Sequence, residues 1–83
     1  FRPIALSEEG LETIELVSLD CTSADPADSW HSDAEIFIDR LGYVRKDGVE
    51  TKAFWDGTIV SGLRPLRLKV RNICGDETVY QLE

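Results

Sequence analysis

The sequence LGYVRKDGVETKAFW, residues 41–55, carries the clearest signal of secondary structure. Two runs rich in β-forming residues, 41–46 and 49–55, flank the dipeptide Asp47-Gly48. This dipeptide favours the two-residue type I′ turn that closes a β-hairpin. The turn places Arg45 opposite Glu50, and the opposite charges of this pair support the alignment. The neighbouring pairs expected from the same register are Lys46 with Val49 and Val44 with Thr51.

Further short strands are predicted on both sides of this hairpin. Residues 33–39 alternate, with Ala34, Ile36 and Ile38 on one face. Residues 66–71 alternate between apolar and basic side chains, and other strands are expected at residues 11–21, 59–63 and 78–82. Residues 1–10 are interpreted as a turn that leads into the first strand. Within residues 11–21 the apolar alternation changes face at Val17, which predicts either a bulge or burial on both faces.

The whole chain, residues 1–83, is predicted to form one domain, because so short a chain cannot build two independent cores. Short strands joined by turns, without an amphipathic helix, predict an all-β fold. We expect a small antiparallel β-sandwich or barrel-like domain of about six to seven short strands. No run approaches the roughly 20 apolar residues of a transmembrane helix.

The formal net charge of −7 is unevenly distributed. Residues 1–39 hold ten acidic residues and one base, whereas residues 40–71 hold eight bases and three acids. An acidic protein is poorly suited to bind nucleic acid, since phosphate contacts require clustered Lys and Arg. The acidic first half suits a cation or a basic partner protein.

The most informative loop is DCTSADPADSWHSD, residues 20–33. Loops this long in a small domain are more often functional than connective. Its carboxylates and carbonyls are the oxygen ligands that Ca²⁺ prefers, although the spacing is not that of an EF-hand. Two interpretations stay open: a calcium site, or a solvated acidic loop in which Asp and Ser side chains cap turns.

Residues 28–38, DSWHSDAEIFI, resemble the first calcium loop of C2-type β-sandwiches. In those domains an Asp is followed some residues later by Ser-Asp and an extended strand. The resemblance covers residues 14–40 and 66–77, and the Pro-Tyr of the family is replaced here by Ala34-Glu35. It implies a Ca²⁺ site with four carboxylate ligands, from Asp25, Asp28, Asp33 and the opposing Asp76. It also implies that Cys21 and Cys74 border the two calcium loops at one end of the sandwich.

The two cysteines, Cys21 and Cys74, allow one disulfide. Such a bridge closes a loop of about fifty residues and stabilises a domain by roughly 3–4 kcal/mol. The alternative is two free thiols. A start at Phe1 fits either a removed secretory leader or an excised fragment. We therefore expect an extracellular protein, with a cytoplasmic one as the alternative.

A basic strand face and two aromatic residues are the other surface candidates. Arg67, Lys69 and Arg71 alternate along one strand, where they either bind an anionic partner, a phosphate or an acidic lipid head, or else guard an edge or simply pair with carboxylates. The second interpretation is favoured. Trp30 is a candidate contact residue because it lies within the acidic loop. The single histidine, His31, has no nucleophile motif around it.

These patterns favour a non-enzymatic binding module for a protein partner, with Ca²⁺ as the expected ligand of its aspartate loop. No set of residues supplies a nucleophile, a base and an oxyanion donor together. The alternatives are a small acidic inhibitor or immunity-type protein that binds a basic partner, or a structural subunit of a larger assembly.

Overall fold

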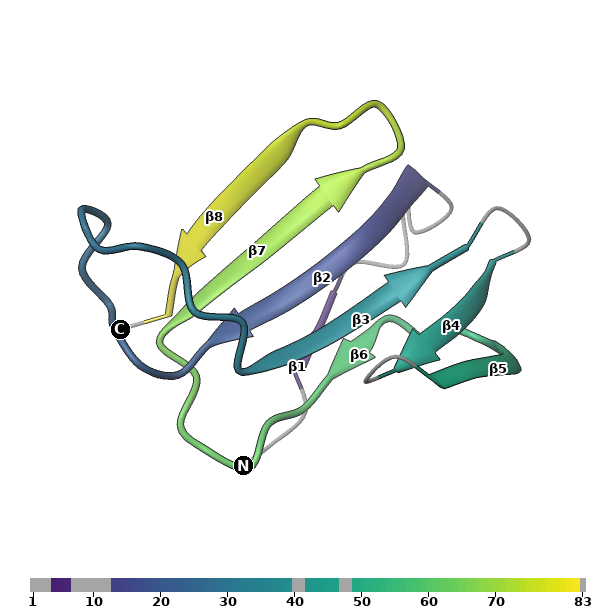
Figure 1. Ribbon diagram of the computed structural model, residues 1–83, viewed down its shortest axis with the longest axis horizontal. Helices are drawn as coiled ribbons and strands as arrows, with labels where there is room; N and C mark the ends of the chain where they lie inside the picture. Colours follow the sequence, from purple (N-terminus) through teal and green to yellow (C-terminus); the bar gives the residue numbers. More distant parts are fainter. Residues whose placement is uncertain (1–3, 7–12, 40–41, 47–48, 83) are drawn as a thin grey trace.

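A computed structural model describes residues 4–6, 13–39, 42–46 and 49–82, which form eight short β-strands (Figure 1). The strands are β1 (Ile4–Ala5), β2 (Ile14–Asp20), β3 (Ala34–Ile38), β4 (Tyr43–Lys46), β5 (Val49–Phe54), β6 (Thr58–Ile59), β7 (Arg67–Asn72) and β8 (Glu77–Gln81). Within these residues no helix is long and apolar enough to cross a membrane. The all-β prediction is confirmed.

Six strands form one antiparallel sheet in the order β5-β4-β3-β2-β7-β8, and β1 pairs with β6 in a second, two-stranded sheet. The large sheet is open, with β5 and β8 at its edges, so the architecture is an unequal sandwich rather than a barrel. The sequence prediction missed β1, whose two residues pair only with Thr58 and Ile59, more than fifty residues along the chain.

The hydrophobic core lies between the two sheets. Its buried side chains are Val17, Leu19, Ile36 and Leu68 from the large sheet and Ile59 from β6. Full burial of each such side chain stabilises the fold by about 1.5–3 kcal/mol. The core is centred on β2, the strand that directly precedes the aspartate loop, and five of its seven residues are buried.

Strand β2 explains the change of face predicted at Val17, because both expected causes are present. Its register against β7 shifts between Ile14 and Leu16. From Leu16 to Asp20 every residue is buried, whichever face its side chain occupies. Val17 and Leu19 face the core, whereas Ser18 and Asp20 face the opposite side of the sheet.

The predicted hairpin register is confirmed at its closed end. Arg45 pairs with Glu50, and Lys46 pairs with Val49. The register then shifts between Tyr43 and Arg45, and Tyr43 lies opposite Phe54. The turn predicted at Asp47-Gly48 lies outside the described residues.

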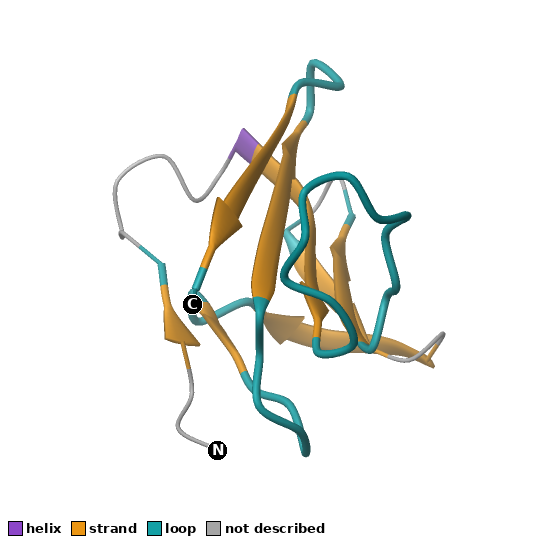
Figure 2. Cartoon of the chain, turned by 90° about the vertical axis from the view of Figure 1, so that its left-hand side faces the viewer, coloured by secondary structure: helices purple, strands orange, loops and turns teal. Residues whose placement is uncertain are grey.

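The two faces of the large sheet are covered differently. Figure 2 shows strand β1 on one side of the sheet and the loop of residues 21–33 on the other. Cross-strand partners share a face of a sheet. Ser18 pairs with Lys69 and Asp20 with Arg67, which places these four polar side chains beneath the loop.

Candidate functional site

The candidate site is the loop of residues 21–33, which Asp20 anchors at both ends. The Asp20 side chain is fully buried. Its Oδ1 accepts hydrogen bonds from the backbone N–H groups of Thr22 and Ser23, at 2.7 and 3.0 Å. Its Oδ2 accepts another from the N–H of His31 at 3.0 Å. One carboxylate therefore fixes the beginning and the end of the loop.

The surroundings of Asp20 keep it ionised. Burial alone raises the pKa of a carboxyl group, because it disfavours the charged form. The hydrogen bonds from the backbone of His31, Ser23 and Thr22 and from the Arg67 guanidinium act in the opposite direction. Together they outweigh burial and hold the pKa of Asp20 well below its ordinary value.

Arg67 occupies the centre of the loop. It begins β7, is only 3% exposed, and forms an ion pair with Asp20 through Nη2. The same Nη2 donates to the carbonyl oxygen of Ser29 at 3.1 Å. Nη1 donates to the carbonyl oxygens of Asp25 and Asp28 at 3.0 and 3.2 Å. One buried guanidinium thus satisfies three backbone carbonyls that no strand pairs.

The Trp30 ring lies against the charged groups of Arg67 and Lys69. The Cζ of Arg67 lies 5.0 Å from a ring centroid of Trp30, and the Nζ of Lys69 lies 4.6 Å from one. Both distances are within the range of cation–π attraction. Trp30 is half-buried and serves as a lid on the polar face of the sheet.

A chain of hydroxyl groups ties this lid to the sheet. Trp30 Nε1 donates to Ser18 Oγ at 3.0 Å, Ser18 Oγ lies 2.9 Å from Ser32 Oγ, and Ser32 Oγ donates to Glu35 Oε2 at 2.6 Å. An ionised carboxylate only accepts, so the proton of Ser32 goes to Glu35. Ser18 therefore donates to Ser32. The chain runs in one direction, from the indole N–H to the carboxylate.

The outer aspartates of the loop accept hydrogen bonds from other loop residues. Asp25 Oδ1 accepts from the N–H of Ala27 at 2.9 Å. Asp28 Oδ2 accepts from Ser23 Oγ at 2.6 Å. Asp33 Oδ2 accepts hydrogen bonds from Cys21 N at 2.7 Å and from Thr22 Oγ1 at 2.9 Å. Asp25 thus has the turn-capping role that the sequence left as the alternative to a calcium site, whereas Asp28 and Asp33 link separate parts of the loop.

The four expected calcium ligands do not come together, because Asp76 lies at the other end of the sheet. Strand β7 runs away from the loop, from Arg67 opposite Asp20 to Asn72 opposite Ile14. Asp76 follows in the turn between β7 and β8. Among the described residues no group of three or more His, Cys, Asp or Glu side chains is placed to hold a metal ion.

The same register separates the cysteines. Cys21 follows the end of β2, whereas Cys74 lies in the turn beyond the far end of β7, and both thiols are free. The length of β2 separates these ends by roughly 20 Å. A disulfide requires Cα atoms within about 7 Å. The expected pairing of Cys21 with Cys74, and their placement at one end of the sandwich, is therefore wrong for this fold.

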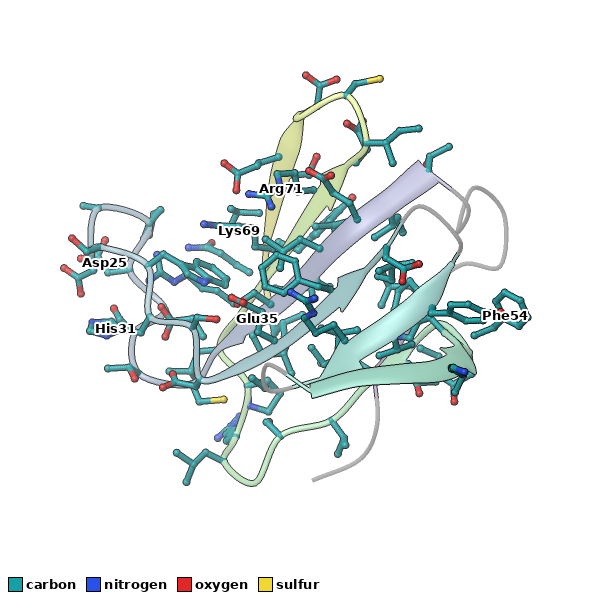
Figure 3. All side chains as sticks on the ribbon, turned by 45° about the vertical axis from the view of Figure 1, so that its right-hand side comes forward. Asp25, His31, Glu35, Phe54, Lys69 and Arg71 are labelled. Carbon is teal, nitrogen blue, oxygen red and sulfur yellow. The ribbon has the colours of Figure 1, made fainter. Side chains whose placement is uncertain are left out.

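The basic strand is an inner strand, so its charges do not guard an edge. Arg67 is buried under the loop and not exposed to a partner. Lys69 lies 3.6 Å from a Glu77 carboxylate oxygen, and Arg71 Nε lies 2.8 Å from Glu15. Of the two favoured alternatives, pairing with carboxylates is thus the one observed, and it holds for all three basic side chains. Figure 3 shows Lys69 and Arg71 on one face of the sheet, with Asp25 and His31 out on the loop.

A second candidate surface, which the sequence did not reveal, lies on the opposite face of the sheet beside β8. A groove of about 540 Å³ is lined by Ile4, Ala5, Leu6, Ile14, Leu68, Val70, Tyr80, Gln81 and Leu82. All five residues of β8 are exposed. Tyr80 is 52% and Leu82 39% exposed. The only sequence signal for this surface is the uncharged run of residues 78–82, and its edge position is a property of the fold.

Comparisons with protein-family models, with curated proteins and with solved structures find no match for this chain. The resemblance of residues 28–38 to a C2 loop stays a prediction about family. The functional conclusion depends on the geometry of the loop and of the groove.

Proposed function

We propose that the protein is a non-enzymatic interaction module that binds a partner protein at the apolar groove beside β8. The observation that carries this proposal is the exposure of Tyr80 and Leu82 at the mouth of the groove. A contiguous exposed apolar surface on a small protein marks an interaction site. Tyrosine is also among the residues that contribute most to binding when a partner covers them.

The groove is suited to binding because its walls are already fixed. Leu68 belongs to the core, and Val70 packs against it on the same strand. Ile4 and Leu6 form the opposite wall and also contact the core. A preformed surface loses little conformational freedom on binding, so more of the contact energy appears as affinity.

Site-specific photo-crosslinking tests this proposal. The photoreactive residue p-benzoylphenylalanine replaces Tyr80 in one variant and Phe54 in a matched control. Phe54 is 71% exposed and lies on β5, at the opposite edge of the sheet. In cells of the organism that produces this protein, we expect one discrete crosslinked partner from position 80 and none from position 54. Equal crosslinking at both positions, or none at position 80, contradicts the proposal.

A second candidate is a basic partner that binds the loop of residues 21–33. The observation that favours it is the Arg67 clamp, which holds the carbonyls of Asp25, Asp28 and Ser29 and so presents the acidic loop in one conformation. Fixed acidic groups steer a basic partner and favour rapid association. The double variant Asp25→Asn, Asp28→Asn keeps both side-chain acceptor oxygens and removes two charges. We expect this variant to slow association with a loop-binding partner at low salt and to leave a groove-binding partner unaffected.

A further inference from the structure

We infer that the groove partner is an extended segment that adds to the outer edge of β8, which no other described strand pairs with, as an additional antiparallel or parallel strand. This inference rests on the proposed function of the groove and specifies the kind of partner. Strand addition combines backbone hydrogen bonds along an edge with pockets for alternate side chains. Strand β8 offers both features on adjacent sides.

The outward backbone groups of β8 are identified by its ladder with β7. The N–H of Leu82 donates to the carbonyl of Leu66 at 2.9 Å, and the N–H of Asn72 donates to the carbonyl of Asp76 at 3.0 Å. Hydrogen-bonded pairs alternate along an antiparallel ladder. In the register of β7 and β8 this assigns Thr78 and Tyr80 to the ladder. The N–H and C=O groups of Glu77, Val79 and Gln81 therefore point to the outer edge.

The two edges of the large sheet differ in how well they resist pairing. Strand β5 includes the exposed Lys52, and its register against β4 is irregular. Charges and bulges of this kind prevent edge-to-edge association. Strand β8 pairs with β7 without a register shift and has no Lys or Arg. An exposed regular edge with apolar residues is what a pairing strand requires.

The surroundings of β8 also define the chemistry of the added strand. On the groove side it lies beside Tyr80 and Leu82, which favours apolar residues at alternate positions. The acidic residues at this edge are Asp76, in the turn before β8, and Glu77, which also pairs with Lys69. The chain carries a net charge of −7, so a segment with positive charge on the intervening positions is complementary to it. Two copies of the chain, each with a net charge of −7, repel one another, so we assign the edge to a basic, alternating segment of another protein.

An eight-residue peptide of alternating lysine and valine, capped at both ends, is a direct probe. Its control has the same composition in two blocks, four lysines followed by four valines. We expect the alternating peptide to bind at least tenfold more tightly than the block peptide at physiological salt. Equal binding of the two peptides, or no binding of the alternating peptide at millimolar concentration, overturns the inference.

Amide hydrogen exchange locates the bound peptide. In the free protein we expect the N–H groups of Glu77, Val79 and Gln81 to exchange fast and those of Thr78 and Tyr80 to exchange slowly. The alternating peptide should slow the first three at least tenfold and leave the other two unchanged. Unchanged exchange at Val79 under saturating peptide overturns strand addition.

Two variants at Val79 separate backbone pairing from side-chain contact. Val79→Pro removes one outward N–H and leaves the ladder to β7 intact, since proline is tolerated on edge strands. Val79→Thr keeps the N–H and a β-branched side chain. We expect Val79→Pro to weaken peptide binding at least tenfold and Val79→Thr to change it less than twofold. Equal affinities for both variants overturn the inference.

The outcomes distinguish this inference from the proposed function. If Tyr80→Ser weakens peptide binding and Val79→Pro does not, the groove binds side chains, and strand addition is wrong. If neither substitution matters, both proposals fail. If the free protein sediments as a dimer that Val79→Pro dissociates, the edge belongs to a second copy of the chain, which overturns the assignment to another protein.

Discussion

Arg67 and Asp20 lie directly opposite each other in the ladder between β2 and β7, and their side chains form a buried ion pair beneath the loop of residues 21–33. The pair does more than neutralise two charges. Asp20 accepts hydrogen bonds from both ends of the loop, and Arg67 donates to three carbonyls within it. The buried pair of Asp20 and Arg67 therefore holds the acidic loop in one conformation.

Removing the cation of this pair should be strongly destabilising. Arg67→Met leaves the Asp20 charge buried without its ion-pair partner, which costs about 3–5 kcal/mol. The matched control is Arg71→Met, which breaks the half-exposed pair with Glu15 and costs at most about 1 kcal/mol. Urea unfolding of both variants measures the difference. Similar losses of free energy of unfolding in the two variants contradict the structural role of Arg67.

The low pKa of Asp20 predicts the acid side of the stability profile. A carboxyl whose pKa is lower in the folded state stabilises the protein above its unfolded pKa of about 3.9, and this contribution is lost as pH falls toward the folded value. We therefore expect the free energy of unfolding to decline between about pH 5 and pH 2. The direct check is the ¹³Cγ chemical shift of Asp20, which should still report a carboxylate near pH 2.5. Titration of Asp20 near its ordinary pKa contradicts the prediction.

Calcium should leave the loop unchanged. Asp76 is too far away to complete the expected ligand set, and the other three carboxylates already accept hydrogen bonds within the loop region. We expect millimolar Ca²⁺ to shift the melting temperature by less than about 1 °C. Amide resonances of residues 21–33 should also stay in place. A saturable shift at Asp25 or Asp28 restores the calcium hypothesis.

The two thiols should react independently. Cys74 is exposed, whereas Cys21 is half-buried with its Sγ 3.6 Å from the carbonyl oxygen of Leu63. Under native conditions iodoacetamide should modify Cys74 first, and mild oxidation should not join the two residues within one chain. Intact-mass measurement follows both reactions. An intramolecular disulfide in the folded protein contradicts the register of β2 and β7.

Local features of the fold could be predicted from the sequence. Arg45 and Glu50 are five residues apart, so the turn between them determines their pairing. The alternation of Ile36 and Ile38 likewise identifies β3 from its own residues. The register shift next to Tyr43 has no local signal.

The two candidate surfaces depend on contacts between residues that are distant in the sequence. Their geometry could therefore be predicted only in part. The end of the sheet at which Asp76 lies follows from the antiparallel pairing of β7 with β2, about fifty residues earlier in the chain. The alternation of Arg67 with apolar residues indicates a basic face but not that the loop covers it. Whether residues 78–82 form an edge or an inner strand is likewise decided by the sheet order.

The buried Asp20–Arg67 pair holds the loop of residues 21–33 against the sheet, and we propose that the β8 edge binds a partner. Residue-resolved amide hydrogen exchange of the protein in a chelator tests both statements together. We expect slow exchange at Thr22, Ser23 and His31, whose N–H groups bind the Asp20 carboxylate, and fast exchange at Val79. Fast exchange at the three loop positions, or protection of Val79 in the free protein, would contradict these statements.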